Sequence, residues 1–300
     1  MSVAISSSTD RPYGVEQVCS AWEVPRSTFY AQRAATGSTD EALRSNRKRG
    51  PKPLLADETL LGLIREDLDA SPFLGEGHRK VWARLRILKE VKVSRKRILR
   101  IMRENNLLSP YRGRRSEGPA HTGKIITTQP NEMWGSDGIR VLTVEDGWGW
   151  VFTAIEHWNA ECVAWHVCKK GDRFAALEPI AMGINRIFGR TDAGVARGLS
   201  LRIDNGTQYL ADHFVNQVRF WGIHPSFAFV EQPQTNGVAE RFNRTLREQA
   251  LNGRIFRNLE EVRVAVAEFV ERYNHHWRLE KLNYLSPVMA RLAHAEGVAA

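Results

Sequence analysis

The sequence predicts a multidomain protein in which N-terminal all-α units precede a larger α/β domain, a mixed five-stranded sheet with helices on both faces. Three observations support this prediction. The chain has 300 residues, 42% of them hydrophobic, which is enough for several small cores. Its excess positive charge lies in the first part of the chain. From Asn131 onward, the apolar residues change from helical spacing to the alternation that is typical of strands.

The distribution of charge separates the chain into two parts. Residues 1–124 contain 24 Lys and Arg against 14 Asp and Glu, whereas residues 125–300 contain 19 and 20. Within residues 77–115, 14 basic residues stand against two acids, Glu90 and Glu104. Such a basic block is typical of a region that binds nucleic acid. A solvated helix face is the alternative, but so many like charges repel one another unless a polyanion is present.

Several protein classes are excluded by composition. No apolar run approaches the length of a membrane span, so no membrane partner is expected. The N-terminus lacks the basic and apolar regions of a signal peptide. The three cysteines have no C-x-x-C spacing, which argues against a disulfide scaffold or a structural zinc site. We therefore expect a cytoplasmic protein.

The first unit, residues 1–35, is predicted to be a helix-turn-helix. Gly14 to Ala21 has helical spacing, and Pro25 is suited to the first position of a second helix, where its missing N–H costs nothing. Residues 36–56 are polar and basic, so they are interpreted as a linker that can follow a phosphate backbone.

A second helical DNA-binding domain is predicted over residues 57–115, followed by a linker over 116–130. Ser94 is a plausible N-cap for its third helix. Apolar residues recur at helical spacing in three stripes: Leu60, Leu61, Ile64 and Leu68; Val81, Leu85 and Leu88; Ile98, Ile101 and Met102. The predicted DNA contacts are the basic residues of the third helix and the segment after it: Arg95, Lys96, Arg97, Arg100, Arg103, Arg112, Arg114 and Arg115.

The α/β core is predicted over residues 131–252, with a helical extension over 253–300. Three consecutive strands followed by alternating helices and strands give a mixed sheet. The predicted strands are 133–144, 150–158, 161–168, 199–203 and 223–230. The predicted helices are 172–188, 211–221, 235–251 and 259–276.

Three carboxylates form the candidate site. Asp137 lies inside the first strand, Asp204 ends the fourth strand, and Glu240 lies on the following helix. If the first and fourth strands are neighbours, both aspartates reach the same edge of the sheet, and the helix can add Glu240. Oxygen ligands alone suit Mg²⁺ or Mn²⁺ better than zinc. Taken singly, Asp137 could be a bulge residue, Asp204 a turn residue and Glu240 a solvated helix residue.

The motifs around these acids resemble those of the DDE transposase and retroviral integrase superfamily. Thirty-five residues separate Asp204 from Glu240. The matching segments are LRIDNGTQY around Asp204, QPQTNGVAERFNRTLRE around Glu240, GHRKVW at 77–82, AHTGK at 120–124, and YN at 273–274 with LSP at 285–287. More narrowly, the chain resembles the OrfB-type transposases of the insertion sequence 3 family.

The resemblance implies an RNase H-like catalytic core. Asp137, Asp204 and Glu240 would be the catalytic residues of that family's D, D-35-E signature and would bind Mg²⁺ or Mn²⁺ as two ions. It also implies DNA contacts by Arg244 and Arg247, and supporting roles beside the carboxylates for Asn205, Tyr209 and Asn236. The chain departs from the family where Trp277-Arg278-Leu279 replaces a usual R-P-H. We assign no catalytic role to His275 and His276.

The implied function is a transposase for a bacterial insertion sequence. It would cleave DNA at the terminal inverted repeats and transfer the strand to target DNA, as a homodimer or higher oligomer. An upstream OrfA frame, alone or as a frameshift fusion, is a possible partner. Two alternatives stay open: a nuclease of the same fold that cuts without joining, and a non-catalytic DNA-binding regulator. The presence of all three acids disfavours the regulator.

Overall fold

The computed structural model describes residues 4–37, 54–110, 125–227 and 236–299. It divides into two compact units, Met1–Ala56 and Asp57–Ala300, which are described separately below. The predicted contacts Arg112, Arg114 and Arg115 and the AHTGK segment lie outside the described residues, as does most of the 36–56 linker.

The first unit contains the two predicted helices. Helix α1 spans Val15–Ala21 and α2 spans Arg26–Gly37. A tight turn joins them, in which the Val24 N–H donates to the carbonyl of Cys19 at 2.9 Å. Cys19 is buried, whereas Tyr30 on α2 is exposed. The short helical pair that the sequence predicts is therefore confirmed.

The second unit begins with three helices: α3 (Asp57–Asp69), α4 (His78–Leu88) and α5 (Arg95–Glu104). The predicted apolar stripes form their common core, which contains Leu60, Ile64, Val81, Leu85, Ile98, Ile101 and Met102. The Ser94 cap is also confirmed, since its side chain accepts from the Arg97 N–H at 3.3 Å. Leu88 was wrongly placed in the core and is 61% exposed.

A buried charge cluster occupies part of this helical interior. Arg84 on α4 donates from Nε and Nη2 to Asp67 of α3, at 3.0 Å and 2.7 Å. Its Nη1 pairs with Glu76, which also accepts from the Ser71 hydroxyl at 2.6 Å. Asp67 and Glu76 are both buried. The interior of this domain is therefore held by ionic contacts as well as apolar ones.

The rest of the unit is built on the predicted five-stranded sheet, in the order β3-β2-β1-β4-β5. Its strands are β1 (Met133–Thr143), β2 (Gly147–Glu156), β3 (Cys162–Cys168), β4 (Ser200–Ile203) and β5 (His224–Phe227). The first three strands pair antiparallel, whereas β1–β4 and β4–β5 are parallel. This mixed sheet confirms the predicted fold class.

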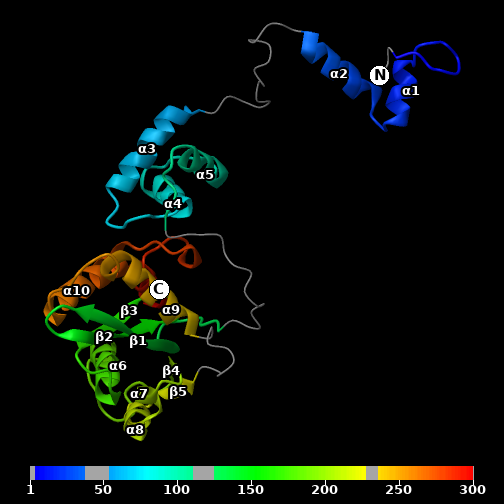
Figure 1. Ribbon diagram of the computed structural model, residues 1–300. Helices are drawn as coiled ribbons and strands as arrows, with labels where there is room; N and C mark the ends of the chain where they lie inside the picture. The colour runs from blue at the N-terminus through cyan, green and yellow to red at the C-terminus, as the bar shows by residue number, and fades with distance from the viewer. Residues whose placement is uncertain (1–3, 38–53, 111–124, 228–235, 300) are drawn as a thin grey trace. The chain divides into compact units, whose positions relative to one another are not determined.

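Helices cover both faces of the sheet, as Figure 1 shows for α6 on one side and α9 and α10 on the other. Two apolar cores result, one with Phe242 and Phe269, the other with Trp134 and Phe214. The helices are α6 (Arg173–Phe188), α7 (Thr207–Leu210), α8 (Asp212–Phe220), α9 (Gly237–Leu246), α10 (Leu259–His276) and α11 (Pro287–Ala299). Asp172 caps α6 by accepting from two backbone N–H groups.

The structure refines three predicted elements. The short helix α7, directly after Asp204, was not predicted. The predicted helix 235–251 consists of α9 followed by a π-helical turn, Arg247–Leu251. The predicted strand 223–230 is described only for β5, since 228–235 lie outside the described residues. The domain boundaries given above stay predictions.

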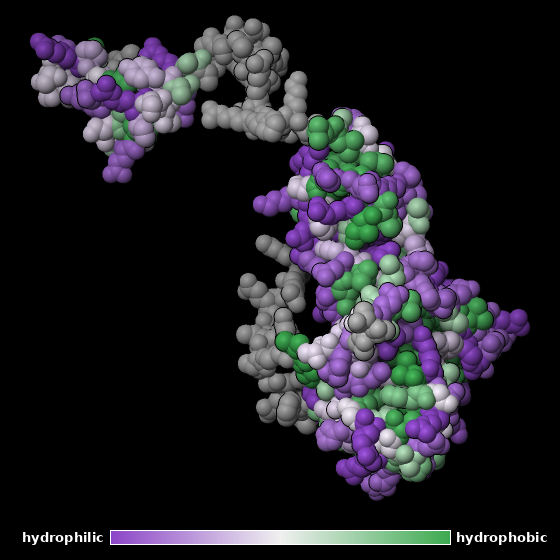
Figure 2. All heavy atoms as spheres, turned by 180° about the vertical axis from the view of Figure 1, so that it is seen from behind, coloured by the Kyte–Doolittle hydropathy of each residue, from purple (hydrophilic) through white to green (hydrophobic). Residues whose placement is uncertain are grey.

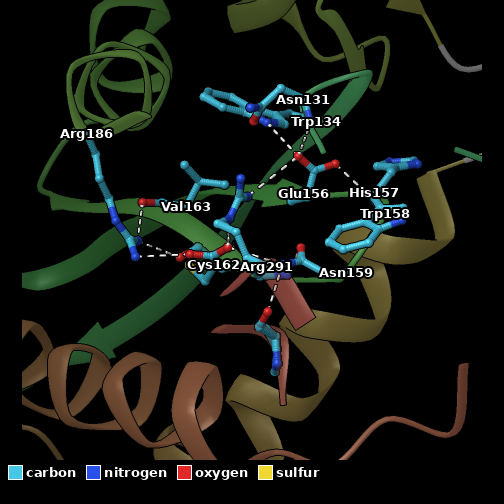
Figure 3. Close-up of polar contacts among 12 residues, drawn as sticks. Asn131, Trp134, Glu156, His157, Trp158, Asn159, Cys162, Val163, Arg186 and Arg291 are labelled. Carbon is cyan, nitrogen blue, oxygen red and sulfur yellow. Dashed lines mark hydrogen bonds and ion pairs between the residues drawn. The ribbon is translucent and has the colours of Figure 1, made fainter. Parts of the chain in front are cut away.

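A buried polar network fixes the start of β1 (Figure 3). The Glu156 carboxylate accepts from the Asn131 N–H at 2.7 Å and from the indole of Trp134 at 3.2 Å. Arg291 of α11 lies 3.8 Å from Glu156 and bonds Glu161 at 2.5 Å. The C-terminal helix is thereby tied to the strands that carry the candidate site.

Contacts also join the three-helix domain to the core. The Leu74 N–H donates to Gln249 Oε1 at 2.9 Å, and Gln249 Nε2 donates back to the Leu74 carbonyl at 2.8 Å. Phe73 packs edge-on against Trp277, with ring centres 4.8 Å apart. Glu280, on a short 3₁₀ helix (Glu280–Leu282), pairs with Arg79 and Arg95.

The surface shown in Figure 2 intersperses hydrophobic residues among hydrophilic ones. Among the described residues, none of the helices has both the length and the apolar character needed to span a membrane.

Candidate active site and DNA contacts

The parallel pair β1–β4 brings Asp137 and Asp204 to the same edge of the sheet. Gly135 on β1 pairs with Arg202 on β4, and Asp137 and Asp204 each follow this pair by two residues. Side chains alternate between the faces of a strand. Asp137 therefore lies on the face of Ile139, which packs in the core formed with α9 and α10. The neighbouring strands that the sequence argument required are present.

Glu240 lies on α9, which crosses this edge of the sheet. The helix approaches β1 closely at Gly135, where an added Cβ would come within 2.8 Å of Asn236 Oδ1 and 3.3 Å of Ala239 Cβ. Glycine at this position lets the start of α9 lie directly against the strand. Glu240 is exposed, whereas Ala239 and Asn243 on the same helix are buried.

The carboxylates affect one another electrostatically. Burial raises the pKa of Asp137 above its ordinary value, and the charge of Asp204 raises this pKa further. Desolvation likewise raises the pKa of Glu240, and the charge of Asp137 adds to this rise. Like charges at one site disfavour ionisation of both. The structure therefore places the three acids within electrostatic reach, in a setting that a cation would stabilise.

Asn243 is a site residue that the sequence analysis missed. Its Nδ2 donates to Asp137 Oδ2 at 2.9 Å, and its Oδ1 accepts from the Thr153 hydroxyl at 3.3 Å. The other oxygen of Asp137 accepts from the Gly138 N–H at 2.8 Å. The carboxylate is thus held in one orientation. The available signal was spacing, because Asn243 stands three residues after Glu240 on the same helix.

The predicted supporting residues lie around the two aspartates. Asn236 Nδ2 donates to the carbonyl of Ser136 at 3.1 Å, which ties the start of α9 to the residue before Asp137. Tyr209 is fully buried, with its hydroxyl 3.3 Å from Ser136 Oγ. Asn205 lies in the turn after Asp204, in which Asp204 Oδ1 accepts from the Gly206 N–H at 2.9 Å.

The donor set suits a hard divalent cation. Asp137, Asp204 and Glu240 offer only carboxylate oxygens, the ligands that Mg²⁺ and Mn²⁺ prefer. The raised pKa values of Asp137 and Glu240 reflect burial first and a neighbouring negative charge second, which a bound cation would offset. In the described part of the chain, however, no three His, Cys, Asp or Glu side chains are close enough to form an assembled metal site. The residues fit such an ion chemically, but the structure does not bring all three together as ligands.

The two predicted DNA contacts near Glu240 are exposed. Arg247 stands at the junction of α9 and the π-helical turn, and its charge lowers the pKa of Asp137, which places it near that carboxylate. Arg244 is 71% exposed at its side chain and lies 3.8 Å from Glu248. Of the two, only Arg247 lies within electrostatic reach of Asp137, and both remain predicted DNA contacts.

The predicted contacts on α5 differ in their surroundings. Arg97 and Arg100 both bind the Asp57 carboxylate at 2.6 Å, which joins α5 to the start of α3. Arg95 pairs with Glu280 of the core at 2.9 Å. Lys96 and Arg103 are exposed and make no ion pair with the described residues. All five residues remain predicted DNA contacts. Among them, only Lys96 and Arg103 form no ion pair with an acid in the described part of the chain.

Two family models match the chain. An HTH-like domain model matches residues 56–115, and an integrase core domain model matches residues 221–287. The first coincides with the three-helix domain. The second includes Glu240 but neither aspartate.

The chain is also similar to curated transposases. It is 27% identical over 288 residues to transposase InsD for insertion element IS2A/D/F/H/I/K of Escherichia coli, covering 92% of this chain and 90% of that protein. The InsD transposase for insertion element IS2D of E. coli strain K12 matches equally. These matches make the chain a homologue of insertion-element transposases.

Solved integrase structures align with parts of the chain. The simian T-cell lymphotropic virus intasome, in complex with PP2A regulatory subunit B56 gamma, aligns with a TM-score of 0.46 and 15% identity over 70% of this chain and 73% of that chain. The HTLV-2 integrase catalytic core in complex with magnesium aligns with a TM-score of 0.41 and 14% identity over 56% of this chain and 99% of that chain.

Proposed function

We propose that this homologue of the IS2 InsD transposases is a DNA transposase that cleaves the ends of its insertion element and joins them to target DNA. The observation that supports the proposal is the parallel pairing of β1 with β4, because Asp137 and Asp204 each follow the pair Gly135–Arg202 by two residues and the charge of Asp204 acts on Asp137. The curated relatives cover nearly the whole chain, which favours the same overall activity. We place this activity in the bacterial cytoplasm, where the element's DNA lies.

Asp137, Asp204 and Glu240 would hold Mg²⁺ or Mn²⁺, in a two-ion arrangement. Such ions activate the attacking oxygen and stabilise the leaving oxygen in a phosphoryl displacement. Asn243 orients Asp137 through its amide N–H, and Asn236 holds the strand before it. Arg247 adds positive charge beside the acids.

The proposed reaction has two displacements at phosphorus. In the first, a water oxygen bonds to the phosphate at an element end, the P–O3′ bond breaks, and a free 3′-hydroxyl is left. In the second, this hydroxyl attacks a phosphate of the target DNA and displaces that strand's own 3′-oxygen. No covalent bond to the enzyme is needed, because the site supplies positioning and electrostatic stabilisation.

Cleavage and joining of labelled DNA that carries the element's ends would test this proposal. We expect activity only with Mg²⁺ or Mn²⁺. Asp204→Asn and Glu240→Gln should each lower turnover on the order of 10²–10³-fold or more, the scale for losing one electrostatic stabiliser. Asp192→Asn is the matched control, since Asp192 is 70% exposed and lies away from the sheet edge.

The outcomes separate the alternatives. Activity that survives in either site variant would exclude the proposed triad. Cleavage without joining, even on pre-nicked ends, would favour a nuclease. Because two ends are joined, we propose at least a dimer on DNA. End-specific binding without cleavage by the intact chain would favour a required OrfA partner or a regulator instead.

A further inference from the structure

The β1–β2 hairpin carries an exposed aromatic and basic surface beyond the carboxylates. Arg140 on β1 lies opposite Trp150 on β2, and the next outward pair is Leu142 and Trp148. The Arg140 guanidinium lies 4.5 Å from the centre of the Trp148 ring and 5.8 Å from that of Trp150. Trp148 is 51% exposed and Arg140 is exposed. The indole of Trp148 and the guanidinium of Arg140 therefore lie side by side and are both accessible to solvent.

A row of aromatic rings continues this surface along the same sheet face as far as Ser136. Trp150 stacks on Phe152, with ring centres 5.6 Å apart and an interplanar angle of 7°. Phe152 meets Tyr209 edge-on, with ring centres 6.4 Å apart. The hydroxyl of Tyr209 reaches Ser136, the residue before Asp137. Because side chains alternate along a strand, this row lies on the sheet face opposite the one that carries Asp137, and it fixes Trp150 beside Arg140 there.

Basic residues extend the surface on the adjacent β3–α6 connection. Lys169, Lys170 and Arg173 are exposed there. A Cβ added to Gly147, at the start of β2, would lie 3.6 Å from Lys169 Nζ, so this lysine reaches the hairpin. We call Arg140, Trp148, Trp150, Lys169, Lys170 and Arg173 the hairpin surface.

The charge of the hairpin surface is not compensated within the described part of the chain. Its four basic residues make no ion pair there. The neighbouring acids already have other partners. Glu145 pairs with Arg257 at 2.5 Å, and Asp146 accepts from the Leu259 N–H at 2.7 Å. Asp172 caps α6. A polyanion is therefore the partner whose charge this surface complements.

We propose that the hairpin surface binds a DNA segment on the sheet face opposite Asp137, with an unpaired base stacked on Trp148 and the phosphates on Arg140 and Lys169. Every base has a flat π-face, so an exposed aromatic ring among cations suits a single-stranded segment of any sequence. Arginine beside the indole favours the same ligand through its contact with phosphate. The inference rests on the proposed function only in taking DNA as the substrate.

Equilibrium binding without divalent metal tests the surface separately from catalysis. The probes are a DNA duplex with a single-stranded extension and the same duplex with blunt ends. Trp148→Ala should weaken binding of the extended duplex about 5- to 100-fold, the range expected for base–aromatic stacking. The blunt duplex should be affected much less. Trp148→Phe should restore most of the affinity, because phenylalanine keeps a stacking face.

Two further variants provide controls. Arg140→Ala should reduce the slope of log affinity against log salt by about 0.7, the value for one phosphate of a single strand. Phe220→Ala and Arg190→Ala match the exposure of the tested side chains, at 52% and 69%, and should leave both quantities unchanged.

Three results would overturn the proposal. The first is an unchanged affinity of Trp148→Ala for the extended duplex. If the oligomeric state of this variant changes at the same time, the surface is a contact between copies of the chain. The second is an equal loss on blunt and extended duplexes. The third is an equal loss in Phe220→Ala. If Trp148 and Arg140 act as expected while the intact chain shows no cleavage, the hairpin surface stands and the proposed function fails.

Discussion

In the three-helix domain, the buried carboxylates of Asp67 and Glu76 both lie against Arg84. At the edge of the sheet, by contrast, the charge of Asp204 adds to the rise in the pKa of Asp137. Both sites contain partly or fully buried acids, but among the described residues only the first sets an arginine ion pair against them. The first group of charges therefore supports the fold, whereas the second carries the negative charge that the proposed function assigns to a cation.

The largest effect should come from removing the shared partner in the helical domain. Arg84→Met leaves Asp67 buried without its cation and Glu76 with Lys80 alone, which should destabilise this domain by about 3–5 kcal/mol. Urea unfolding, together with hydrogen exchange of the α3 and α4 amides, would measure the loss. Arg79→Met is the control on the same helix, because Arg79 is 59% exposed at its side chain and its surface pair should contribute only about 0–1 kcal/mol. Equal losses in the two variants would contradict the comparison.

A substitution at the carboxylate site is expected to change the free energy of unfolding in the opposite direction. Asp137→Asn removes a charge that the fold disfavours and keeps a side chain of the same shape. It should stabilise the metal-free protein by about 0.5–2 kcal/mol, as other stabilising substitutions do, while abolishing strand cleavage. Mg²⁺ should raise the melting temperature of the unmodified chain but not of the variant. A variant less stable than the parent would show that the Asp137 charge is already compensated in the fold.

Acid should therefore act on the two sites in opposite directions. Burial alone would raise the pKa of Glu76, but Lys80 and Arg84 outweigh it and lower this pKa below 4.5. Its stabilising contribution is complete above 4.5 and is lost as the pH falls through the lowered value. The pKa of Asp137 is raised above 3.8, so protonation on acidification relieves repulsion at the edge. Hydrogen exchange across this pH range should show the helical domain weakening first.

A smaller effect separates paired from unpaired basic residues on the helical domain. Replacing Lys96 and Arg103 together by alanine should lower the salt slope of DNA binding by about 2, one for each lost phosphate contact. Lys89→Ala is the comparison, because Lys89 already pairs with Glu66 at 2.8 Å and should change the slope less. If the salt slope changes equally per replaced residue in the double variant and in Lys89→Ala, an ion pair within the protein does not prevent a basic residue from binding DNA.

Local patterns predicted the fold well, because strand alternation and helical stripes depend on neighbouring residues. The same patterns placed Asp137, Asp204 and Glu240 on the elements where the structure has them. They place Asn243 only three residues after Glu240 on the same helix; its partner Asp137 lies far away in the chain, so the contact itself is not visible in local patterns. Nor could they predict that Asp57 would bind Arg97.

The charge count had a similar limit. It identified the basic block before residue 116 but treated all its members alike, although several have acidic partners in the fold. It also passed over the hairpin surface, because the core as a whole has almost no net charge. Arg140 and its neighbours stand out only when the partners of the surrounding acids are known.

The exchanged pair of hydrogen bonds between Leu74 and Gln249 has a mechanical consequence. Gln249 belongs to the π-helical turn that continues the helix of Glu240, and Leu74 belongs to the segment between α3 and α4. A displacement of this segment therefore has to break two hydrogen bonds or move the turn that follows the helix of Glu240.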